Sequence, residues 1–220
     1  MSINLQSLRL YQERMAKHVV LKDDFNEPPL RIAGADMAFI DEKGICACVN
    51  VQLPDMEVIE TSTTIKQLTF PYIRGYLAFR EADSVISAYK QLTNQSDVLL
   101  VNAHGIAHPR FYGAASHIGV LLDTATIGVA SNNLCGHYDN EPSQTGDAIV
   151  CSHLGRNVGY LFKSKKKCRP IFVSPGHKIT MSSAIQVIKS CMRTHKMPEP
   201  IYLAHINANM GKQRELNPLL

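Results

Sequence analysis

The sequence lacks the features that most directly assign a protein to a class. It contains no Walker loop and no GxGxxG, HExxH or GxSxG motif, which are the signatures of nucleotide-binding loops, zinc proteases and serine hydrolases. No apolar run approaches the length of a membrane span, and the first 20 residues lack the long apolar stretch of a signal peptide. We therefore expect a cytoplasmic protein, or a nuclear one if the cell has a nucleus, without membrane contact.

Cysteine occurs six times but never with the CxxC spacing of a metal or redox site. Cys46 and Cys48 alternate within an apolar stretch, and side chains two residues apart in a strand point to the same face. Small buried hydrophobic side chains are therefore the favoured interpretation, ahead of a metal or disulfide role.

The composition and charge exclude little. Of the 220 residues, 45% are hydrophobic and 19% are charged, as in a typical soluble globular protein. The net charge of +4 is too small to establish nucleic-acid binding, although it does not oppose it. One dense basic run, KSKKKCR at 163–169, is by default a solvated loop or strand end, with a phosphate contact as the alternative.

The first third of the chain predicts a helix followed by an antiparallel sheet. Residues 1–20 have an amphipathic pattern, and two prolines in 23–30 stop any helix there. The apolar stretches 31–40 and 44–53 are separated by Asp-Glu-Lys, which predicts a β-hairpin. The β-branched residues of 56–68 predict a third antiparallel strand.

The rest of the chain alternates between apolar residues at helical spacing and short buried strands. This part predicts helices at 76–93, 111–123 and 180–195, and strands at 98–101, 125–130, 158–165 and 169–175. The pattern indicates a single α/β domain over 1–220, with a mixed sheet and helices on both faces. In such sheets ligands collect at the carboxyl ends of buried strands, and Asn102 directly follows one of these strands.

Three ionisable side chains are candidates for chemistry, each with a structural alternative. Asp36 interrupts an apolar strand, where a carboxylate is costly unless it is solvated, paired or bound to a metal; a solvent-facing or edge position would explain it equally well. Glu81 lies in the first turn of its helix, where the helix dipole alone favours an acid. His177 follows a buried strand in SPGHKIT, but most lone histidines are satisfied core or surface groups.

Two further segments could contact a ligand. His104 and His108 bracket a glycine, and the sequence His108-Pro109-Arg110 predicts a helix start, which either binds an anion or merely begins the helix. Tyr72 lies in the rigid turn FPYIRGY, where an exposed ring could stack on a base or wedge into a duplex. A tyrosine packed under a loop is the commoner alternative.

Together, five motifs in order resemble the endonuclease V family, which recognises deaminated adenine (inosine) in nucleic acid. IAGADMAF resembles the first metal-carboxylate strand, FPYIRGYLAFRE the wedge turn with its following helix, and VNAHGIAHPR the family pattern VDGxGxxHPR. The stretch GAASHIGVLLDTATIGVA with LCG, and CRPIFVSPGHKITMSSA with MPEP, continue the likeness. The resemblance covers most of the chain, from about Ile32 to Pro200.

The resemblance implies a ribonuclease-H-like fold and hydrolysis of the second phosphodiester 3′ of inosine in DNA or RNA, in DNA repair or inosine-RNA processing. It implies Mg²⁺ as the cofactor, with Mn²⁺ as an alternative, and we expect a monomer. Carried over by motif, Asp36 and Glu81 are metal ligands and catalytic residues, and Asn102 occupies the place of a third. His177 would lie beside the metal and help to handle the attacking water.

The same resemblance assigns substrate contacts. Tyr72 would be the wedge that holds strands apart after the base has been flipped into a pocket. Gly105, His108 and Gly136 would line that pocket or hold the backbone, and Ser131 stands where the family has a lysine that contacts the reacting phosphate.

The chain departs from the family pattern at four positions. Asn102 replaces Asp, Ala103 replaces Gly, Ser131 replaces Lys, and Ser182 replaces a residue that is commonly acidic. Mg²⁺ prefers anionic oxygens, so an amide oxygen in place of a carboxylate removes a full negative charge from the site. A lost cation near the phosphate costs on the order of 10²–10³ in rate.

Two interpretations of these departures remain open. Either the protein is a working nuclease that uses Mn²⁺ or a higher metal concentration with Asn102 as a neutral ligand, or it binds inosine-containing nucleic acid without cutting it. Engineered inactivation is a weaker third alternative, because Ala103, Ser131 and Ser182 would each need a separate explanation.

Overall fold

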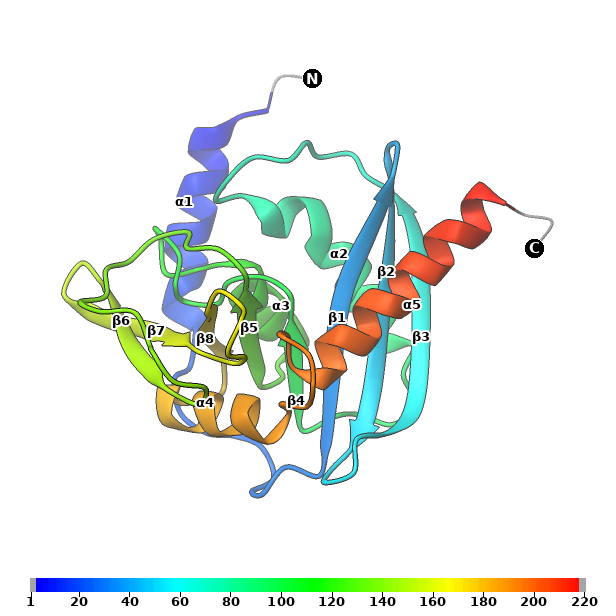
Figure 1. The fold of residues 1–220 in the computed structure, drawn as a ribbon. Helices are drawn as coiled ribbons and strands as arrows, with labels where there is room; N and C mark the ends of the chain where they lie inside the picture. The colour runs from blue at the N-terminus through cyan, green and yellow to red at the C-terminus, as the bar shows by residue number, and fades with distance from the viewer. Residues whose placement is uncertain (1–2, 218–220) are drawn as a thin grey trace.

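The computed structural model describes residues 3–217, in which eight strands form one mixed sheet covered by helices (Figure 1). The strand order is β3-β2-β1-β4-β5-β8-β7-β6. The strands are β1 (Arg31–Ile40), β2 (Lys43–Gln52), β3 (Glu57–Gln67), β4 (Val98–Val101), β5 (Thr126–Ala130), β6 (Ala148–His153), β7 (Arg156–Phe162) and β8 (Ile171–His177). The helices are α1 (Leu5–Met15) with the short 3₁₀ helix Ala16–His18, α2 (Leu77–Lys90), α3 (Ala114–Leu122), α4 (Met181–Ser190) and α5 (Glu199–Leu216).

The predicted hairpin is confirmed, with β1 and β2 paired from Arg31 opposite Gln52 to Ile40 opposite Lys43. Both strands are buried over most of their length because helices cover both of their faces. Asp36 is a carboxylate in the middle of this buried strand, with only 8% of its surface exposed. The alternative of a solvent-facing Asp36 is therefore wrong.

Helices cover both faces of the sheet, as the sequence predicts. On one face, Ala82 of α2 and Ile118 of α3 share a core with Leu99 of β4. On the other face, α4 and α5 pack on the neighbouring residue Leu100, with Ala204 contributed by α5. None of the helices within residues 3–217 combines the length and the apolar character that crossing a membrane requires.

The strand directions decide which polar residues can meet. β1, β4 and β5 are parallel, so their carboxyl ends lie at one edge of the sheet. β8 is antiparallel to β5, with Phe172 opposite Ala130 and His177 opposite Thr126. The loop before β8 therefore lies at the edge of Asn102 and Ser131, whereas His177 lies at the opposite edge.

Three features differ from the sequence expectation. β6 and α5 were not predicted: β6 has no regular apolar alternation, and the buried face of α5 consists largely of small residues. Residues 108–110 do not start a helix, since α3 begins only at Ala114. Before it, Phe111 has a positive φ of 54°, and the Gly113 amide donates to the Gly105 carbonyl. The expected anion-binding helix start at 108–110 is therefore absent.

Candidate active site

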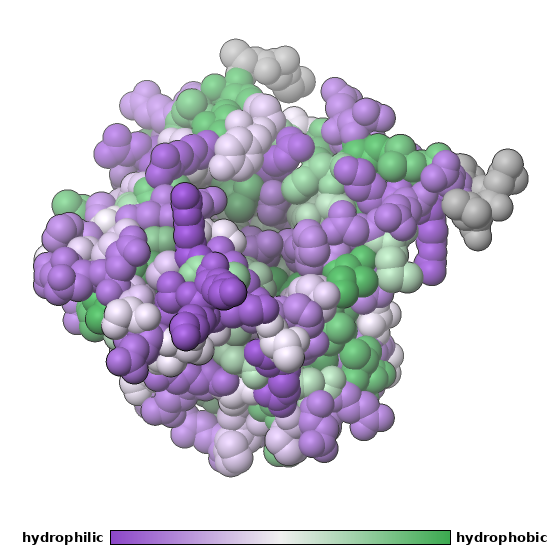
Figure 2. Space-filling view, viewed as in Figure 1, coloured by the Kyte–Doolittle hydropathy of each residue, from purple (hydrophilic) through white to green (hydrophobic). Residues whose placement is uncertain are grey.

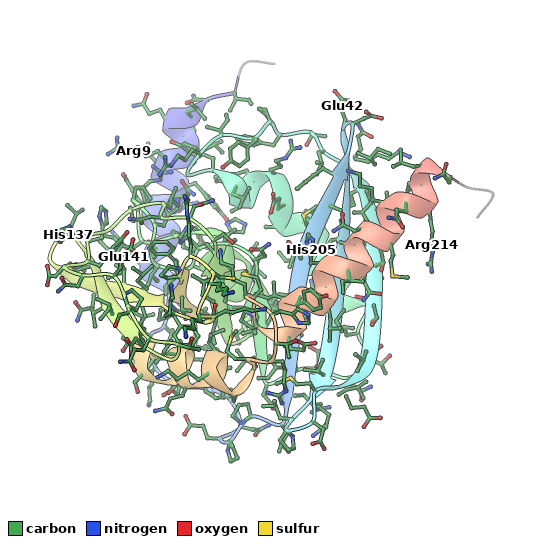
Figure 3. All side chains as sticks on the ribbon, viewed as in Figure 1. Arg9, Glu42, His137, Glu141, His205 and Arg214 are labelled. Atoms are coloured by element: carbon green, nitrogen blue, oxygen red, sulfur yellow. The ribbon has the colours of Figure 1, made fainter. Side chains whose placement is uncertain are left out.

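Asp36 lies at the centre of the candidate site and is held by side chains from two other elements. Asn102, directly after β4, donates from Nδ2 to Oδ1 of Asp36 at 2.8 Å. His205 of α5, labelled in Figure 3 beside β1, has Nδ1 2.8 Å from Oδ2. Since a carboxylate can only accept, Nδ1 carries the proton, and both oxygens of Asp36 have a protein donor.

The position of His205 follows from how closely α5 runs along β1. Gly34 allows this approach, because a Cβ at Gly34 would lie 2.2 Å from the backbone of Pro200 at the start of the helix. Further along, Ala38 and Ala208 are in the same small buried cluster. His205 lies between these two contacts and is thereby aligned with Asp36, which lies between Gly34 and Ala38 on the same face of the strand.

Glu81 approaches the same site from α2. Burial of its side chain, reinforced by the negative charge of Asp36, raises the pKa of Glu81 to about 7. Among residues 3–217 no hydrogen-bond donor or ion-pair partner satisfies its carboxyl group. Two close carboxyl groups, one of them without a protein partner, form a site that a bound cation would stabilise.

The donor set fits a divalent cation in part. Asp36 and Glu81 supply the hard oxygen ligands that Mg²⁺ prefers, and Asn102 would add an amide oxygen if it turned away from its hydrogen bond to Asp36. Within the described residues, however, no three His, Cys, Asp or Glu side chains are grouped closely enough to hold a metal together. The arrangement is thus a two-carboxylate site completed by an amide.

A pocket of about 490 Å³ opens beside Asn102. It lies between the turn before α2 and the loops that follow β4 and β5. Its lining includes Tyr72, Asn102, His104, His108 and Ser131. Because Asn102 both lines the pocket and contacts Asp36, the pocket and the carboxylate site are adjacent.

The turn that carries Tyr72 is anchored by three hydrogen bonds to one of its own carbonyl groups. The Gly75 oxygen accepts hydrogen bonds from Gln12 Nε2 at 3.2 Å, His108 Nε2 at 3.0 Å and an Arg110 guanidinium nitrogen at 2.6 Å. Tyr72 itself is 71% exposed. An exposed ring on an anchored turn is what a base-stacking or wedge role requires, and the packed alternative is wrong.

The two histidines near the pocket are neutral for a physical reason. Burial lowers the pKa of His108 and of His104 to about 4 each. His108 Nδ1 accepts from the Arg110 amide, so its Nε2 carries the proton and donates to Gly75. His108 therefore positions the Tyr72 turn as well as lining the pocket.

The remaining predicted substrate contacts have different surroundings. Gly105 is not among the residues that line the pocket; its amide donates to Ser174 Oγ, and a Cβ would lie 2.0 Å from the Pro175 carbonyl. Gly136 has a φ of +105°, and a Cβ there would meet Cys151. Close packing and backbone conformation explain why glycine occupies both positions. Ser131, in contrast, lines the pocket directly.

His177 is not brought to the site. The Val20 amide donates to its Nδ1 at 3.2 Å, and its Nε2 lies 3.7 Å from Asp123. Because β8 runs antiparallel to β5, this residue ends the strand at the edge opposite Asn102. The structure therefore does not support the expectation that His177 lies beside the metal and handles water.

Ser182 is also remote from the site, since it is exposed in the first turn of α4, which follows directly from the end of β8 that carries His177. The departure from the family pattern at Ser182 therefore removes no carboxylate from the Asp36 site.

The residue that sequence reasoning missed is His205. Its signal is the helical spacing of Ile201, Ala204 and Ala208, which marks a buried face with His205 on its flank.

The chain is similar to solved structures of endonuclease V from several organisms. The endonuclease V structure from Streptomyces avermitilis is 27% identical, with a TM-score of 0.89, over 98% of this chain and 96% of that one. The catalytic domain of human endonuclease V has the same identity and TM-score, over 98% and 99%. Endonuclease V of Ciona intestinalis, in complex with a 24mer DNA containing an inosine followed by a ribo-adenosine, is 25% identical with a TM-score of 0.81, over 96% and 98%.

The sheet, its covering helices and these likenesses define a nuclease with a ribonuclease-H-like fold, as the sequence motifs predict. The endonuclease V family profile matches residues 13–206, which is most of the chain. The protein belongs to the endonuclease V family.

Proposed function

We propose that the protein binds inosine-containing DNA or RNA, takes the flipped base into the pocket beside Asn102, and hydrolyses the second phosphodiester on the 3′ side. The observation that carries the proposal is that one residue joins the two parts of the site. Asn102 lines the pocket and contacts Asp36. A base held in the pocket would thereby bring a neighbouring phosphate to the carboxylates.

The Tyr72 turn would hold the strand open. Tyr72 is exposed at the rim of the pocket, and stacking of a base on an aromatic ring contributes about 1–3 kcal/mol per base. The three donors to the Gly75 carbonyl keep the turn in place while the ring contacts the nucleic acid. Tyr72 would thus compensate for the stacking that the flipped base loses.

Asp36 and Glu81 would hold a divalent cation, with Asn102 as a neutral third ligand. A bound cation of this kind polarises a phosphate and lowers the pKa of a bound water. The charge of Glu81 depends on pH, because its pKa is about 7 and cation binding requires its ionised form. His205 would orient Asp36 through Nδ1, and its own ring is held by the Asn209 amide, whose Nδ2 lies 3.2 Å from Nε2.

A second candidate function is binding without cleavage. It is favoured by one observation, namely that the amide of Asn102 already gives Asp36 a hydrogen-bond donor. That contact satisfies the carboxylate without a cation. In this alternative the pocket and Tyr72 recognise inosine, and the carboxylate site no longer catalyses cleavage.

The test compares labelled single-stranded DNA and RNA oligonucleotides that carry one inosine with matched oligonucleotides that carry adenosine. Each is incubated with the protein in Mg²⁺ and then in Mn²⁺, and both cleavage and binding are measured. Cleavage only of the inosine oligonucleotides, lost in the Asp36→Asn variant, supports the nuclease. Preferential binding without cleavage supports the alternative, and equal binding of inosine and adenosine rejects both.

A further inference from the structure

The charges of this chain are segregated along the sequence. Residues 148–198 contain ten lysines and arginines but no Asp or Glu, although an even distribution would place about four of the 19 acidic residues there. The rest of the chain holds 13 basic residues against all 19 acidic ones. A net charge of +4 therefore conceals a strongly basic segment within an otherwise acidic protein.

The densest part of this segment is an exposed loop at the same end of the sheet as Asn102 and Ser131. Lys165, Lys166, Lys167 and Arg169, here called the basic ridge, are all exposed between β7 and β8. Because Phe172 at the start of β8 lies opposite Ala130 at the end of β5, the ridge shares an edge with Ser131 and Asn102. Figure 1 draws this loop in yellow above α4, and Figure 2 shows strongly hydrophilic side chains gathered over that part of the front of the molecule.

Three contacts, along two routes, connect the segments that carry the basic ridge to the pocket wall. Phe172, three residues after Arg169, packs against the ring of His104 with centroids 6.2 Å apart, and His104 lines the pocket. Lys165 Nζ donates at 2.7 Å to the carbonyl of Thr194 in the loop before α5. Met197 of that loop lies against Ser131, which also lines the pocket. The ridge and the pocket are therefore parts of one continuous surface.

The outermost cations of the ridge are available to a ligand. Throughout the described chain, Lys166 and Lys167 have neither an ion-pair nor a hydrogen-bond partner. Other basic residues of the segment are engaged: Lys178 pairs with Asp24 and Asp123, and Arg156 lies over the ring of Phe111. Unpaired cations without an acidic neighbour in sequence attract a polyanion from solution.

We propose that the basic ridge, with Lys166 and Lys167 at its exposed tip, binds the sugar-phosphate backbone of the nucleic acid outside the base pocket. It would read charge rather than sequence, and so supply affinity without a preference for inosine. This inference rests on the proposed function for the identity of the ligand. It adds where the flanking strand lies, namely over the β7–β8 loop toward the loop before α5.

The experiment uses the double variant Lys166→Glu/Lys167→Glu of the full chain. Binding to a long single-stranded oligonucleotide with one inosine, and to its adenosine counterpart, is measured by fluorescence anisotropy over a series of salt concentrations. The matched control is Lys17→Glu/Lys90→Glu, which makes the same change in net charge at two exposed positions elsewhere. Thermal unfolding of both variants verifies that the fold is retained.

We expect the ridge variant to bind both oligonucleotides more weakly by a similar factor. The slope of log affinity against log salt should become shallower by about 0.7 for each phosphate that the variant no longer neutralises. The control should keep the slope of the unmutated protein. On an oligonucleotide cut down to the inosine and its nearest neighbours, the ridge variant and the unmutated protein should bind alike.

Equal slopes in the ridge variant and the control would overturn the proposal, because the effect would then come from overall charge. A second overturning result is loss of binding to phosphatidylserine vesicles with an unchanged oligonucleotide slope, which would assign the ridge to an anionic membrane. A result that rejects the proposed inosine-specific function can be distinguished from one that rejects the ridge. In that case the unmutated protein does not distinguish inosine from adenosine, whatever the ridge variant does to the salt dependence.

Discussion

Asn102 gives Asp36 a hydrogen-bond donor 2.8 Å from its carboxylate oxygen, at the position where the family pattern has a third carboxylate beside Asp36 and Glu81. Two carboxylates at such a distance cannot both be ionised without a cation between them. The amide removes this repulsion and with it one reason for the site to bind a metal. The pair is therefore stable by itself, and cation binding has to break its hydrogen bond.

Replacing Asn102 with Asp restores the repulsion and the charge. We expect Asn102→Asp to lower stability above neutral pH in the absence of a divalent cation and to raise the melting temperature strongly when Mg²⁺ is added, because a ligand that binds only the folded state stabilises it. Cleavage of inosine oligonucleotides should rise by about 10²-fold or more. Thermal unfolding with and without Mg²⁺ and a cleavage time course measure the two effects.

Asn133→Asp is the control for that experiment, since it adds the same charge at another residue that lines the pocket. It should give no gain in the Mg²⁺-dependent shift. If Asn102→Asp likewise showed neither a shift nor increased cleavage, the strand tip would not be where activity is limited.

Glu81 should make stability depend on pH in a specific direction. Its pKa in the folded protein is about 7, above the ordinary value of 4.5, so the folded state holds a proton that the unfolded state has released. Its contribution to stability is present below about pH 4.5 and is lost as the pH rises through 7. Glu81→Gln should therefore stabilise the protein at about pH 8, by up to about 3 kcal/mol, and little at about pH 4.

Urea unfolding of the unmutated protein and Glu81→Gln at the two pH values measures this difference. Glu57→Gln, an exposed carboxyl group on β3, is the control and should show no such dependence. If Glu81 is a metal ligand, added Mg²⁺ should reduce the difference in the free energy of unfolding between Glu81→Gln and the unmutated protein at the higher pH. A stabilisation of the same size at both pH values would contradict the raised pKa as the cause.

The exposed ring of Tyr72 should matter for recognition and not for stability. Because the side chain is 71% exposed, Tyr72→Ala should change the free energy of unfolding by no more than about 0.5 kcal/mol. Removing one base-stacking ring should weaken binding of the inosine oligonucleotide by roughly 10-fold. Anisotropy titrations measure this, and Tyr72→Phe should keep most of the affinity. Unchanged affinity in Tyr72→Ala would remove the wedge from the proposal.

Gln12 should affect the same step through the anchor of the Tyr72 turn. It donates to the Gly75 carbonyl, accepts from Arg110 and also lines the pocket, so Gln12→Ala loosens the turn and removes one polar side chain from the pocket wall. We expect a stability loss of about 1 kcal/mol and an inosine affinity between those of the unmutated protein and Tyr72→Ala. Glu13→Ala, the neighbouring exposed residue on α1, should do neither. Equal inosine affinity in Gln12→Ala and the unmutated protein would show that the anchor is only structural.

The sequence was most informative where side-chain chemistry conflicts with its local surroundings. Asp36 within an apolar strand and Asn102 at a strand end both signal a site, and the structure brings the two together. His177 carried no such conflict, and only the antiparallel direction of β8 shows that it lies at the other edge. Strand direction is set by distant pairing, which local periodicity does not contain.

His205 was missed for a different physical reason. The buried face of α5 consists of Pro200, Ile201, Ala204 and Ala208, so it has only one of the large apolar side chains by which a buried helix is normally identified. Small residues allow the helix to approach β1 closely, and that approach is what places His205 on Asp36. The same feature thus hides the helix in the sequence and forms the contact in the structure.

Buried neutral histidines should make the protein sensitive to acid, and His117 is the clearest test. Its ring lies among Tyr11, Phe79 and Tyr112, and burial lowers the pKa of His117 to about 4. In the unfolded chain His117 is protonated near pH 6.5, whereas in the folded chain it stays neutral until about pH 4. The free energy of unfolding therefore falls as the pH drops through this window. His117→Phe, which fills the same aromatic surroundings, should remove up to about 3 kcal/mol of that fall. Urea unfolding at about pH 7 and about pH 4.5 measures the change, with the exposed His18→Phe as the control. An identical loss of stability on acidification in His117→Phe and the unmutated protein would show that His117 is not responsible.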